Sequence, residues 1–338
     1  MNNTWAFLPM RASSDLLGDA DALRARLDED SYLYLPGLLD RDKVLALRHD
    51  IVDVLAERKW LRADEYLMDA ISIIPPLREG EDAFLEAYDA VQKLEAFHTL
   101  AHDEALVGVM RDVVGPTAFP HPLKIARLSF PGNYEVSTPP HQDYPNNQGT
   151  KDLVASWIPV GDCPLVQGSL AVLRGSSRYG VLPLDRHPGA GNRQAVVPLH
   201  MLEELRWVTA DFEAGDVLLF PSTAVHASLH NASDFTMRLS VDFRYQQEGE
   251  PLTELVLHPH FQRLTWDEIY EGWQSDEHQY YWRDLDYEVV PFEDYPLVTA
   301  DPEDVEWAEI LRHDQKVTVR YERRMARLAE ELAPQEQA

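Results

Sequence analysis

Residues 216–231 have the sequence DVLLFPSTAVHASLHN, in which two β-rich segments flank a short polar connection. Six further segments of this kind lie between Leu123 and Tyr245, and Gly, Pro, Asn and Asp residues separate them. Eight short strands at such spacing predict a sandwich or jelly roll, so we expect a mainly β core with flanking helices. The predicted strands are Leu123–Phe130, Leu153–Pro159, Ser169–Arg174, Ala195–Leu199, Trp207–Phe212, Asp216–Phe220, Val225–Asn231 and Met237–Tyr245.

The residues before this β-rich stretch have a helical pattern. From Ser14 to about Arg111, apolar residues recur every three or four positions, which predicts three or four packed helices. One such run follows Asp40, a residue type that often caps the N-terminus of a helix. The run consists of Val44, Leu47, Ile51 and Leu55.

The chain after Glu250 is aromatic and acidic, and residues 317–332 predict a further helix. We expect its aromatic side chains to pack on the β core. Because no repeat or Gly/Ser linker interrupts the sequence, we expect a single domain with three regions. These regions are a mainly helical N-terminal region (residues 1–115), the β core (116–250) and a C-terminal aromatic and acidic extension with a helix (251–338).

Composition excludes several classes of protein. The 338 residues include 30 basic and 58 acidic side chains, for a net charge of −28, and one cysteine. This charge opposes nucleic-acid binding, and a single cysteine excludes an internal disulfide framework. No apolar run reaches the roughly 18 residues that span a bilayer, so we expect no membrane partner. The first residues lack a charged and apolar leader pattern, which predicts a cytoplasmic location.

The triplet His141-Gln142-Asp143 suggests a metal site. Side chains at positions i and i+2 of an extended strand point to the same side, so His141 and Asp143 could share one ion. In a chain with 13 histidines the triplet alone is a weak signal. His226, on a later predicted strand, could supply a third ligand. Two histidines and one carboxylate leave three positions of an octahedral ion open, as in non-haem Fe(II) oxygenases, whereas zinc hydrolases use a tetrahedral site.

A second polar group lies twelve residues beyond His226, at Arg238-Leu239-Ser240. Strand alternation places Arg238 and Ser240 on one face, and Ser228 lies on the strand of His226. A guanidinium and two hydroxyls could bind a carboxylate that enters the barrel. An ordinary surface arginine is the alternative, and the upstream triad makes that reading less favourable.

Together these residues resemble the phytanoyl-CoA dioxygenase family. The resemblance covers about residues 30–245 and begins at Tyr32–Leu39, which is similar to the entry strand of that family. One departure is Arg174-Gly175-Ser176-Ser177, where the family usually has Pro-Gly-Ser-His. The other motifs that carry the resemblance are Trp157-Ile158-Pro159, Gly168-Ser169-Leu170, Gly175-Ser176, Gly215-Asp216-Val217 and His226-x-Ser228-x-x-Asn231.

The resemblance implies an Fe(II)- and 2-oxoglutarate-dependent oxygenase on a cupin-like double-stranded β-helix. The implied iron ligands are His141, Asp143 and His226. Arg238 would bind the distal carboxylate of 2-oxoglutarate with help from Ser228, while Gln142 and Trp157 would lie near this cosubstrate. O₂ would be consumed, and succinate and CO₂ released. Related halogenases have a small residue in place of the carboxylate ligand, so Asp143 favours hydroxylation, or another oxidation such as desaturation, over halogenation.

Some assignments stay open. Arg127 and Lys124 are weak candidates for the anchor of the other oxoglutarate carboxylate. His230 shares the face of His226 but lacks its spacing to Ser228 and Asn231. His258 and His260 are expected in a loop without chemistry, and Cys163 as a small buried hydrophobe. Substrate specificity is expected at the barrel mouth, with candidates Tyr144, Asn146, Asn147, residues 187–192 and the early helical region.

The expected substrate is a small or medium-sized metabolite, such as a natural-product intermediate or an amino-acid derivative. An acyl-CoA hydroxylase of the same family is the first alternative, but coenzyme A needs a basic landing site and the chain is strongly acidic. Its densest basic cluster, Arg320, Arg323, Arg324 and Arg327, lies far along the chain from the triad. A non-oxidative, cupin-like metal-binding protein and an inactive interaction module are further alternatives.

Overall fold

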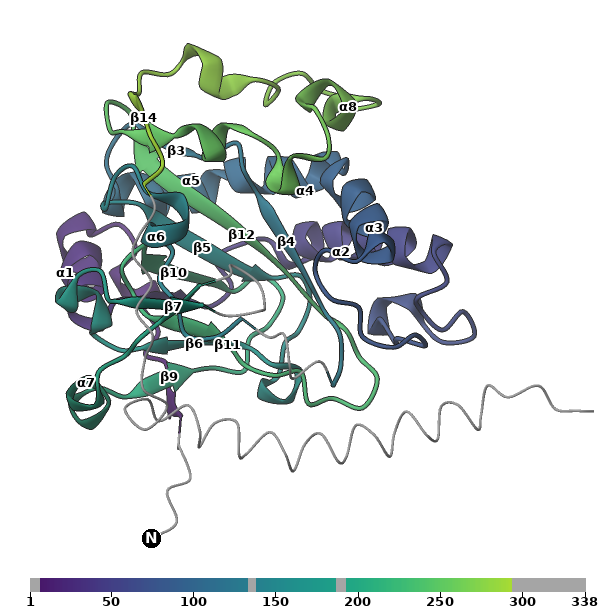
Figure 1. The fold of residues 1–338 in the computed structure, drawn as a ribbon, viewed down its shortest axis with the longest axis horizontal. Helices are drawn as coiled ribbons and strands as arrows, with labels where there is room; N and C mark the ends of the chain where they lie inside the picture. Colours follow the sequence, from purple (N-terminus) through teal and green to yellow (C-terminus); the bar gives the residue numbers. More distant parts are fainter. Residues whose placement is uncertain (1–6, 133–137, 187–192, 294–338) are drawn as a thin grey trace, which may run out of the picture.

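Two β-sheets lie face to face in the computed structural model, which describes residues 7–132, 138–186 and 193–293 (Figure 1). Neighbouring strands in both sheets are antiparallel, except β1 and β9. The larger sheet has the order β2 (Leu33–Leu35), β10 (Val217–Pro221), β5 (Val154–Pro159), β12 (Arg238–Gln247) and β3 (Ala118–Pro120), with β4 (Ile125–Ser129) also paired to β12. The smaller sheet has the order β1 (Leu8–Pro9), β9 (Trp207–Thr209), β6 (Leu170–Leu173) and β11 (His226–Ser228). Two separate pairs are β7 (Leu184–Arg186) with β8 (Arg193–Ala195), and β13 (Leu252–Thr253) with β14 (Val289–Val290).

This two-sheet core confirms the predicted jelly roll, and seven of the eight predicted strands correspond to strands β4, β5, β6, β9, β10, β11 and β12. The prediction for Ala195–Leu199 is wrong beyond its first residue, because β8 ends at Ala195 and helix α7 (Leu199–Glu204) begins at Leu199. Ala195 and Val197 are both buried, but only Ala195 lies in a strand. Pro198 has no N–H to donate to a neighbouring strand and is the N-cap of α7.

Within the described residues, five α-helices precede the β core, rather than the three or four predicted. The count differs because α4 spans only five residues, too few to show a helical period. Asp40 caps α2 as predicted: its side chain accepts hydrogen bonds from the N–H groups of Asp42 and Lys43. The helices pack their apolar faces on the outer face of the larger sheet (Figure 1). They are α1 (Ala20–Asp30), α2 (Arg41–Glu57), α3 (Asp82–Gln92), α4 (Glu95–Thr99) and α5 (Glu104–Val113).

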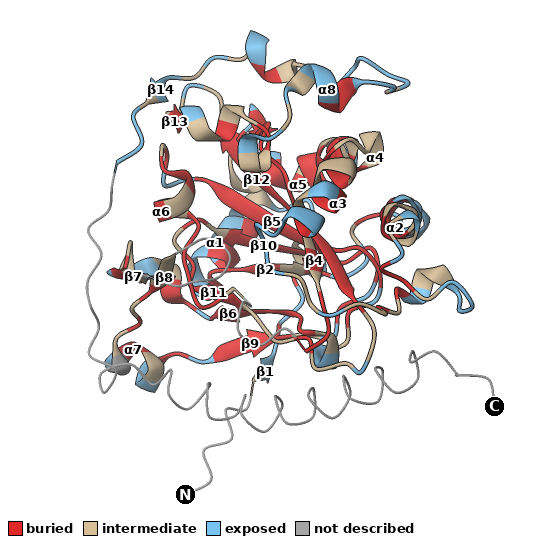
Figure 2. Ribbon diagram, turned by 45° about the vertical axis from the view of Figure 1, so that its right-hand side comes forward, coloured by how far each residue is buried: buried red, intermediate tan, exposed pale blue. Residues whose placement is uncertain are grey.

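Strand β12 is buried on both faces (Figure 2). One face carries Leu239, Val241, Phe243 and Tyr245, which belong to the core shared with the N-terminal helices. Because side chains alternate along a strand, the polar residues between them face the space between the two sheets. This polar row of β12 consists of Arg238, Ser240, Asp242, Arg244 and Gln246.

The aromatic segment after β13 packs partly on itself, around helix α8 (Trp266–Tyr270), and partly on the rest of the protein. As expected, Tyr281 and Tyr287 pack against a cluster of the β core that includes Phe119 and Ile125. Tyr281 Oη also donates to the Pro120 carbonyl at 2.7 Å, and Trp273 Nε1 donates to the Lys93 carbonyl at 3.1 Å. The helix predicted at 317–332 lies outside the described residues. None of the helices described here is long and apolar enough to cross a membrane.

Candidate active site

His141 and His226 are neighbours because their backbones pair. The His141 N–H donates to the His226 carbonyl at 2.9 Å, and the His226 N–H donates to the His141 carbonyl at 3.0 Å. This pairing adds residue 141 to the edge of the smaller sheet beside β11. Asp143 lies two residues further on, and its Oδ1 atom is 3.9 Å from His141 Nε2 and 3.8 Å from His226 Nε2.

Backbone carbonyls orient both imidazoles. His141 Nδ1 lies 2.7 Å from the Pro139 oxygen, and His226 Nδ1 lies 3.1 Å from the Ala224 oxygen. A carbonyl only accepts hydrogen bonds, so Nδ1 carries the hydrogen in both rings and the Nε2 lone pairs point toward Asp143. Burial lowers the pKa of His141 to about 3 and also lowers the pKa of His226, which keeps both rings neutral near pH 7.

These three side chains fit a divalent metal ion. One ligand atom from each lies within 4.8 Å of the other two, and all three residues are buried. Neutral imidazoles whose Nδ1–H groups are already bonded, together with a carboxylate, make a typical set of metal ligands. Among the described residues, His141, Asp143 and His226 form the one group of three possible metal ligands that lie this close together. The second histidine of the group is His226 and not His230.

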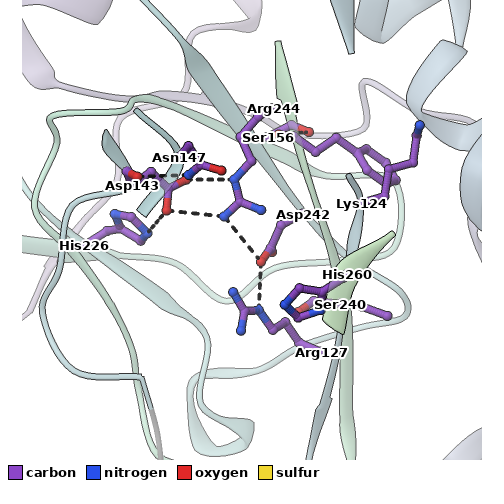
Figure 3. A network of polar contacts seen from close by, with 12 residues as sticks. Lys124, Arg127, Asp143, Asn147, Ser156, His226, Ser240, Asp242, Arg244 and His260 are labelled. Atoms are coloured by element: carbon purple, nitrogen blue, oxygen red, sulfur yellow. Dashed lines mark hydrogen bonds and ion pairs between the residues drawn. The ribbon is translucent and has the colours of Figure 1, made fainter. Parts of the chain in front are cut away.

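Arg244 contacts Asp143 directly and is not among the site residues expected from the sequence (Figure 3). Its Nε donates to Oδ2 at 3.0 Å and its Nη2 donates to Oδ1 at 3.3 Å. Burial alone would raise the pKa of Asp143, but Arg244 and the two imidazoles outweigh burial and hold this pKa below its usual value. Alternation along the strand could have placed Arg244 on the same face as Arg238, although it could not identify its partner.

Arg238 is buried and held by the two predicted hydroxyls. Its Nη1 donates to Ser240 Oγ at 2.6 Å, and its Nη2 donates to Ser228 Oγ at 2.7 Å. The guanidinium carbon lies 5.9 Å from the centre of the Trp157 ring, so Trp157 is also beside it. Among the residues that the structure describes, Nε has no hydrogen-bond partner, and burial lowers the pKa of this arginine. Arg238 is therefore held in place as a cation, and some of its N–H groups remain available to donate hydrogen bonds to a ligand.

A pocket beside the triad contains Arg238 and Arg244 together with Arg127. Arg127 Nε donates to Asp242 Oδ2 at 2.8 Å, and its Nη1 lies 3.5 Å from Glu79. Asp242 Oδ1 is buried without a hydrogen-bond partner in the described part of the chain. The lining residues are Arg127, Thr138, His141, Trp157, Leu170, Phe220, His226, Ser228, Arg238, Asp242 and Arg244.

The side-chain amide of Gln142 binds backbone groups. Its Nε2 donates to the carbonyls of Gly180 and Thr223, and its Oε1 accepts from the Leu182 N–H. Both ends of the amide therefore bind backbone, and they join residue 142 to the segments around Gly180 and Thr223.

Lys124 also lies apart from the pocket lining. Its Nζ donates to the Tyr281 hydroxyl at 3.2 Å and to the His121 carbonyl at 3.3 Å, beneath the C-terminal aromatic segment. Of the two weak candidates for the second cosubstrate carboxylate, only Arg127 lines the pocket. Asn147, a candidate for substrate contact, donates instead to the Asp143 carbonyl at 2.9 Å and so supports the metal-ligand turn.

The other residues considered in the sequence contact neighbouring side chains or lie on local structure outside the triad. His260 bonds to the Tyr88 hydroxyl at 2.6 Å, and His258 bonds to Glu254 at 3.1 Å. Cys163 is buried as expected, and burial raises the pKa of its thiol to about 11. Tyr144 and Asn146 lie on the short helix α6 (Tyr144–Asn147), directly after the metal-ligand Asp143. The candidate loop 187–192 and the basic cluster at Arg320–Arg327 lie outside the described residues.

A family model described as phytanoyl-CoA dioxygenase (PhyH) matches residues 27–240. The chain belongs to the phytanoyl-CoA dioxygenase family. This membership confirms the resemblance seen in the sequence, and the protein is an oxygenase of this family.

Curated relatives of this family member include hydroxylases. The 1-deoxypentalenic acid 11-beta-hydroxylase of Streptomyces arenae is 28% identical over 246 residues, which covers 68% of this chain and 82% of the relative. The enzyme of the same name from Streptomyces exfoliatus is 26% identical over the same length. Among solved structures, the apo form of ThoJ, described as a non-heme monooxygenase, has a TM-score of 0.49 and 15% identity, covering 91% of this chain and 99% of ThoJ.

Proposed function

We propose that this protein uses Fe(II), 2-oxoglutarate and O₂ to hydroxylate a small or medium-sized metabolite, such as a natural-product intermediate or an amino-acid derivative. The observation that carries the proposal is the His141–Asp143–His226 triad beside a pocket that also contains the buried Arg238. The triad would hold the iron. Bound iron supplies the O₂ chemistry that converts 2-oxoglutarate to succinate and CO₂ while the substrate is oxidised.

Arg238 would bind the distal carboxylate of 2-oxoglutarate. A guanidinium is suited to a carboxylate because it can donate two parallel hydrogen bonds. Ser228 and Ser240 already occupy one donor of each terminal nitrogen, which fixes the plane of the guanidinium before the cosubstrate arrives. Trp157 lies beside the guanidinium, with its ring centre 5.9 Å from the guanidinium carbon. These residues preorganise the cosubstrate site.

The proposed substrate class rests on charge and on the curated relatives. The chain has a net charge of −28, which disfavours a polyanion such as coenzyme A, although local pockets are screened from distant charge. The two curated hydroxylases act, by their names, on 1-deoxypentalenic acid, and each match covers 68% of this chain and 82% of the relative. The pocket also has the apolar side chains Trp157, Leu170 and Phe220, which suit a hydrocarbon skeleton.

The proposal is tested by loading the purified protein anaerobically with Fe(II) and 2-oxoglutarate, adding O₂, and measuring O₂ consumption and succinate. A panel of terpenoid acids, amino-acid derivatives and other free acids is compared with coenzyme A thioesters of matched acids. We expect one class of free metabolite to stimulate succinate formation and to gain one oxygen atom by mass spectrometry.

The matched control is His226→Ala, which removes one iron ligand and should give neither succinate nor product. Stimulation by the thioesters alone would replace the small metabolite with an acyl-CoA substrate. If 2-oxoglutarate and Fe(II) never promote O₂ consumption above the His226→Ala background, the oxygenase proposal fails.

A further inference from the structure

We infer that Arg244 is a positioning residue that restricts Asp143 to one metal-binding oxygen. This inference rests on the proposed function, because it assumes that the triad binds Fe(II). Arg244 lies 101 residues after Asp143 and contacts both of its carboxylate oxygens. The pair is buried, with side-chain exposures of 4% for Arg244 and 3% for Asp143, so water competes little with it.

The two oxygens of Asp143 have different surroundings. Oδ1 is the oxygen that both imidazole Nε2 atoms approach, at 3.9 and 3.8 Å. Oδ2 receives the shorter of the two hydrogen bonds from Arg244, at 3.0 Å from Nε. A charged hydrogen bond in a buried site is costly to break, because the guanidinium would then lose its partner. Oδ1 is therefore the oxygen available to a metal, while Oδ2 stays with Arg244.

Arg244 is itself fixed in place. It lies on β12, where its backbone pairs with Ala155 of β5. Its Nη2 is 4.0 Å from Asp242, and Asp242 in turn accepts a hydrogen bond from Arg127. Figure 3 shows this succession of charged side chains leading from Arg127 to Asp143. The guanidinium thus lies beside two carboxylates and cannot easily turn away from Asp143.

The contact between Arg244 and Asp143 affects how many coordination positions of a bound metal ion stay open. An octahedral ion held by two histidines and one carboxylate oxygen keeps three positions open. If both oxygens of Asp143 were bound, two positions would remain, and a cosubstrate that chelates through two atoms would fill them. By retaining Oδ2, Arg244 keeps a position for a third small ligand. Neither imidazole can do this, since each supplies one nitrogen.

The test compares Arg244→Met, which removes the donors, with Arg244→Lys, which keeps one cationic donor. Co(II) binding is measured by titration, and the number of ligands is determined by X-ray absorption at the cobalt edge. Nitric oxide then serves as a probe of the remaining position in the Fe(II)–2-oxoglutarate complex, and its binding is followed by electron paramagnetic resonance. Arg48→Met is the matched control, because Arg48 is also buried but donates to the Met68 and Val160 carbonyls.

We expect Arg244→Met to bind Co(II) with one additional oxygen ligand and to bind nitric oxide at least tenfold more weakly than the unmodified protein. Arg244→Lys should retain most nitric oxide binding, and Arg48→Met should retain all of it. Unchanged nitric oxide binding in Arg244→Met, or a folded Arg244→Met that binds no Co(II), would overturn the inference. Failure of the unmodified protein to bind Fe(II) and 2-oxoglutarate would instead count against the proposed function.

Discussion

The imidazole rings of His141 and His226 lie with their centroids 4.1 Å apart, although 85 positions separate them in the chain. Reciprocal backbone hydrogen bonds produce this contact, so the spacing of the two rings depends on the pairing of two segments rather than on side-chain packing alone. A metal site built on paired backbone is rigid, and removing one side chain should leave the pairing intact.

The first prediction concerns the three ligands. His141→Ala, Asp143→Ala and His226→Ala should each reduce Fe(II) affinity by at least about 100-fold and abolish succinate formation, because two remaining donors hold the ion poorly against water. Titration with Fe(II) under anaerobic conditions measures the affinity, and circular dichroism checks the fold.

His230→Ala is the control for this series, since it removes a histidine near β11 that is not part of the triad. Its Fe(II) affinity should remain close to that of the unmodified protein. A larger loss in His230→Ala than in His226→Ala would show that the third ligand has been assigned wrongly.

The second prediction concerns Arg238. In Arg238→Ala a cosubstrate carboxylate would be left without its partner, at a cost of about 2–5 kcal/mol. The apparent KM for 2-oxoglutarate should therefore rise about 30-fold or more, while Fe(II) affinity changes little because the triad is intact. Steady-state succinate formation at varied 2-oxoglutarate measures this change.

Ser228→Ala provides a graded comparison, because it removes one of the two hydroxyls that orient Arg238 and leaves the charge in place. Its KM should rise by less than that of Arg238→Ala. An unchanged KM in Arg238→Ala would mean that another residue binds the distal carboxylate.

The third prediction concerns Lys124 and stability. Burial lowers the pKa of Lys124 to about 7, whereas an unfolded lysine has a pKa of about 10.4. The unfolded chain thus binds more protons between these values, so the contribution of Lys124 to the free energy of unfolding rises as the pH rises from about 7 to about 10. Lys124→Met removes the free-energy cost of burying a charged ammonium group and should stabilise the protein at pH 7 by at least about 1 kcal/mol.

Urea unfolding at several pH values measures this effect. Lys124→Met should lose the part of the pH dependence that lies between about pH 7 and pH 10, whereas Lys93→Met, which replaces a lysine of 40% side-chain exposure, should keep it. A destabilised Lys124→Met at pH 7 would show that the hydrogen bonds to Tyr281 and His121 outweigh the desolvation of the charge.

The fourth prediction concerns the reaction outcome. Asp143 completes the triad, so the product should be hydroxylated or otherwise oxidised, for example desaturated, and its formation should not depend on chloride. Product is analysed by mass spectrometry in chloride-containing and chloride-free buffer. A chlorinated product from the unmodified protein would contradict the assignment of Asp143 as a metal ligand.

The sequence was sufficient for the parts of the molecule that depend on local patterns. Seven of the eight β-rich segments that lie between Gly, Pro, Asn and Asp residues are strands, and the i, i+2 spacing of His141 and Asp143 together with the family resemblance predicted the metal group. The same kind of pattern failed at residues 195–199, where Pro198 is the N-cap of a helix. The three-region division of the chain stays a prediction.

The contacts between distant polar side chains were decided by the tertiary structure. Alternation can place Arg244 inside the barrel, but its contact with Asp143 depends on how β12 pairs with β5 and on how the 141–143 segment pairs with β11. The contacts of the Gln142 amide with backbone carbonyls and of Arg127 with Asp242 also depend on how distant segments pair. A local pattern determines the face of a strand on which a side chain lies. Strand register and barrel closure, which bring together residues far apart in the chain, determine the group it meets.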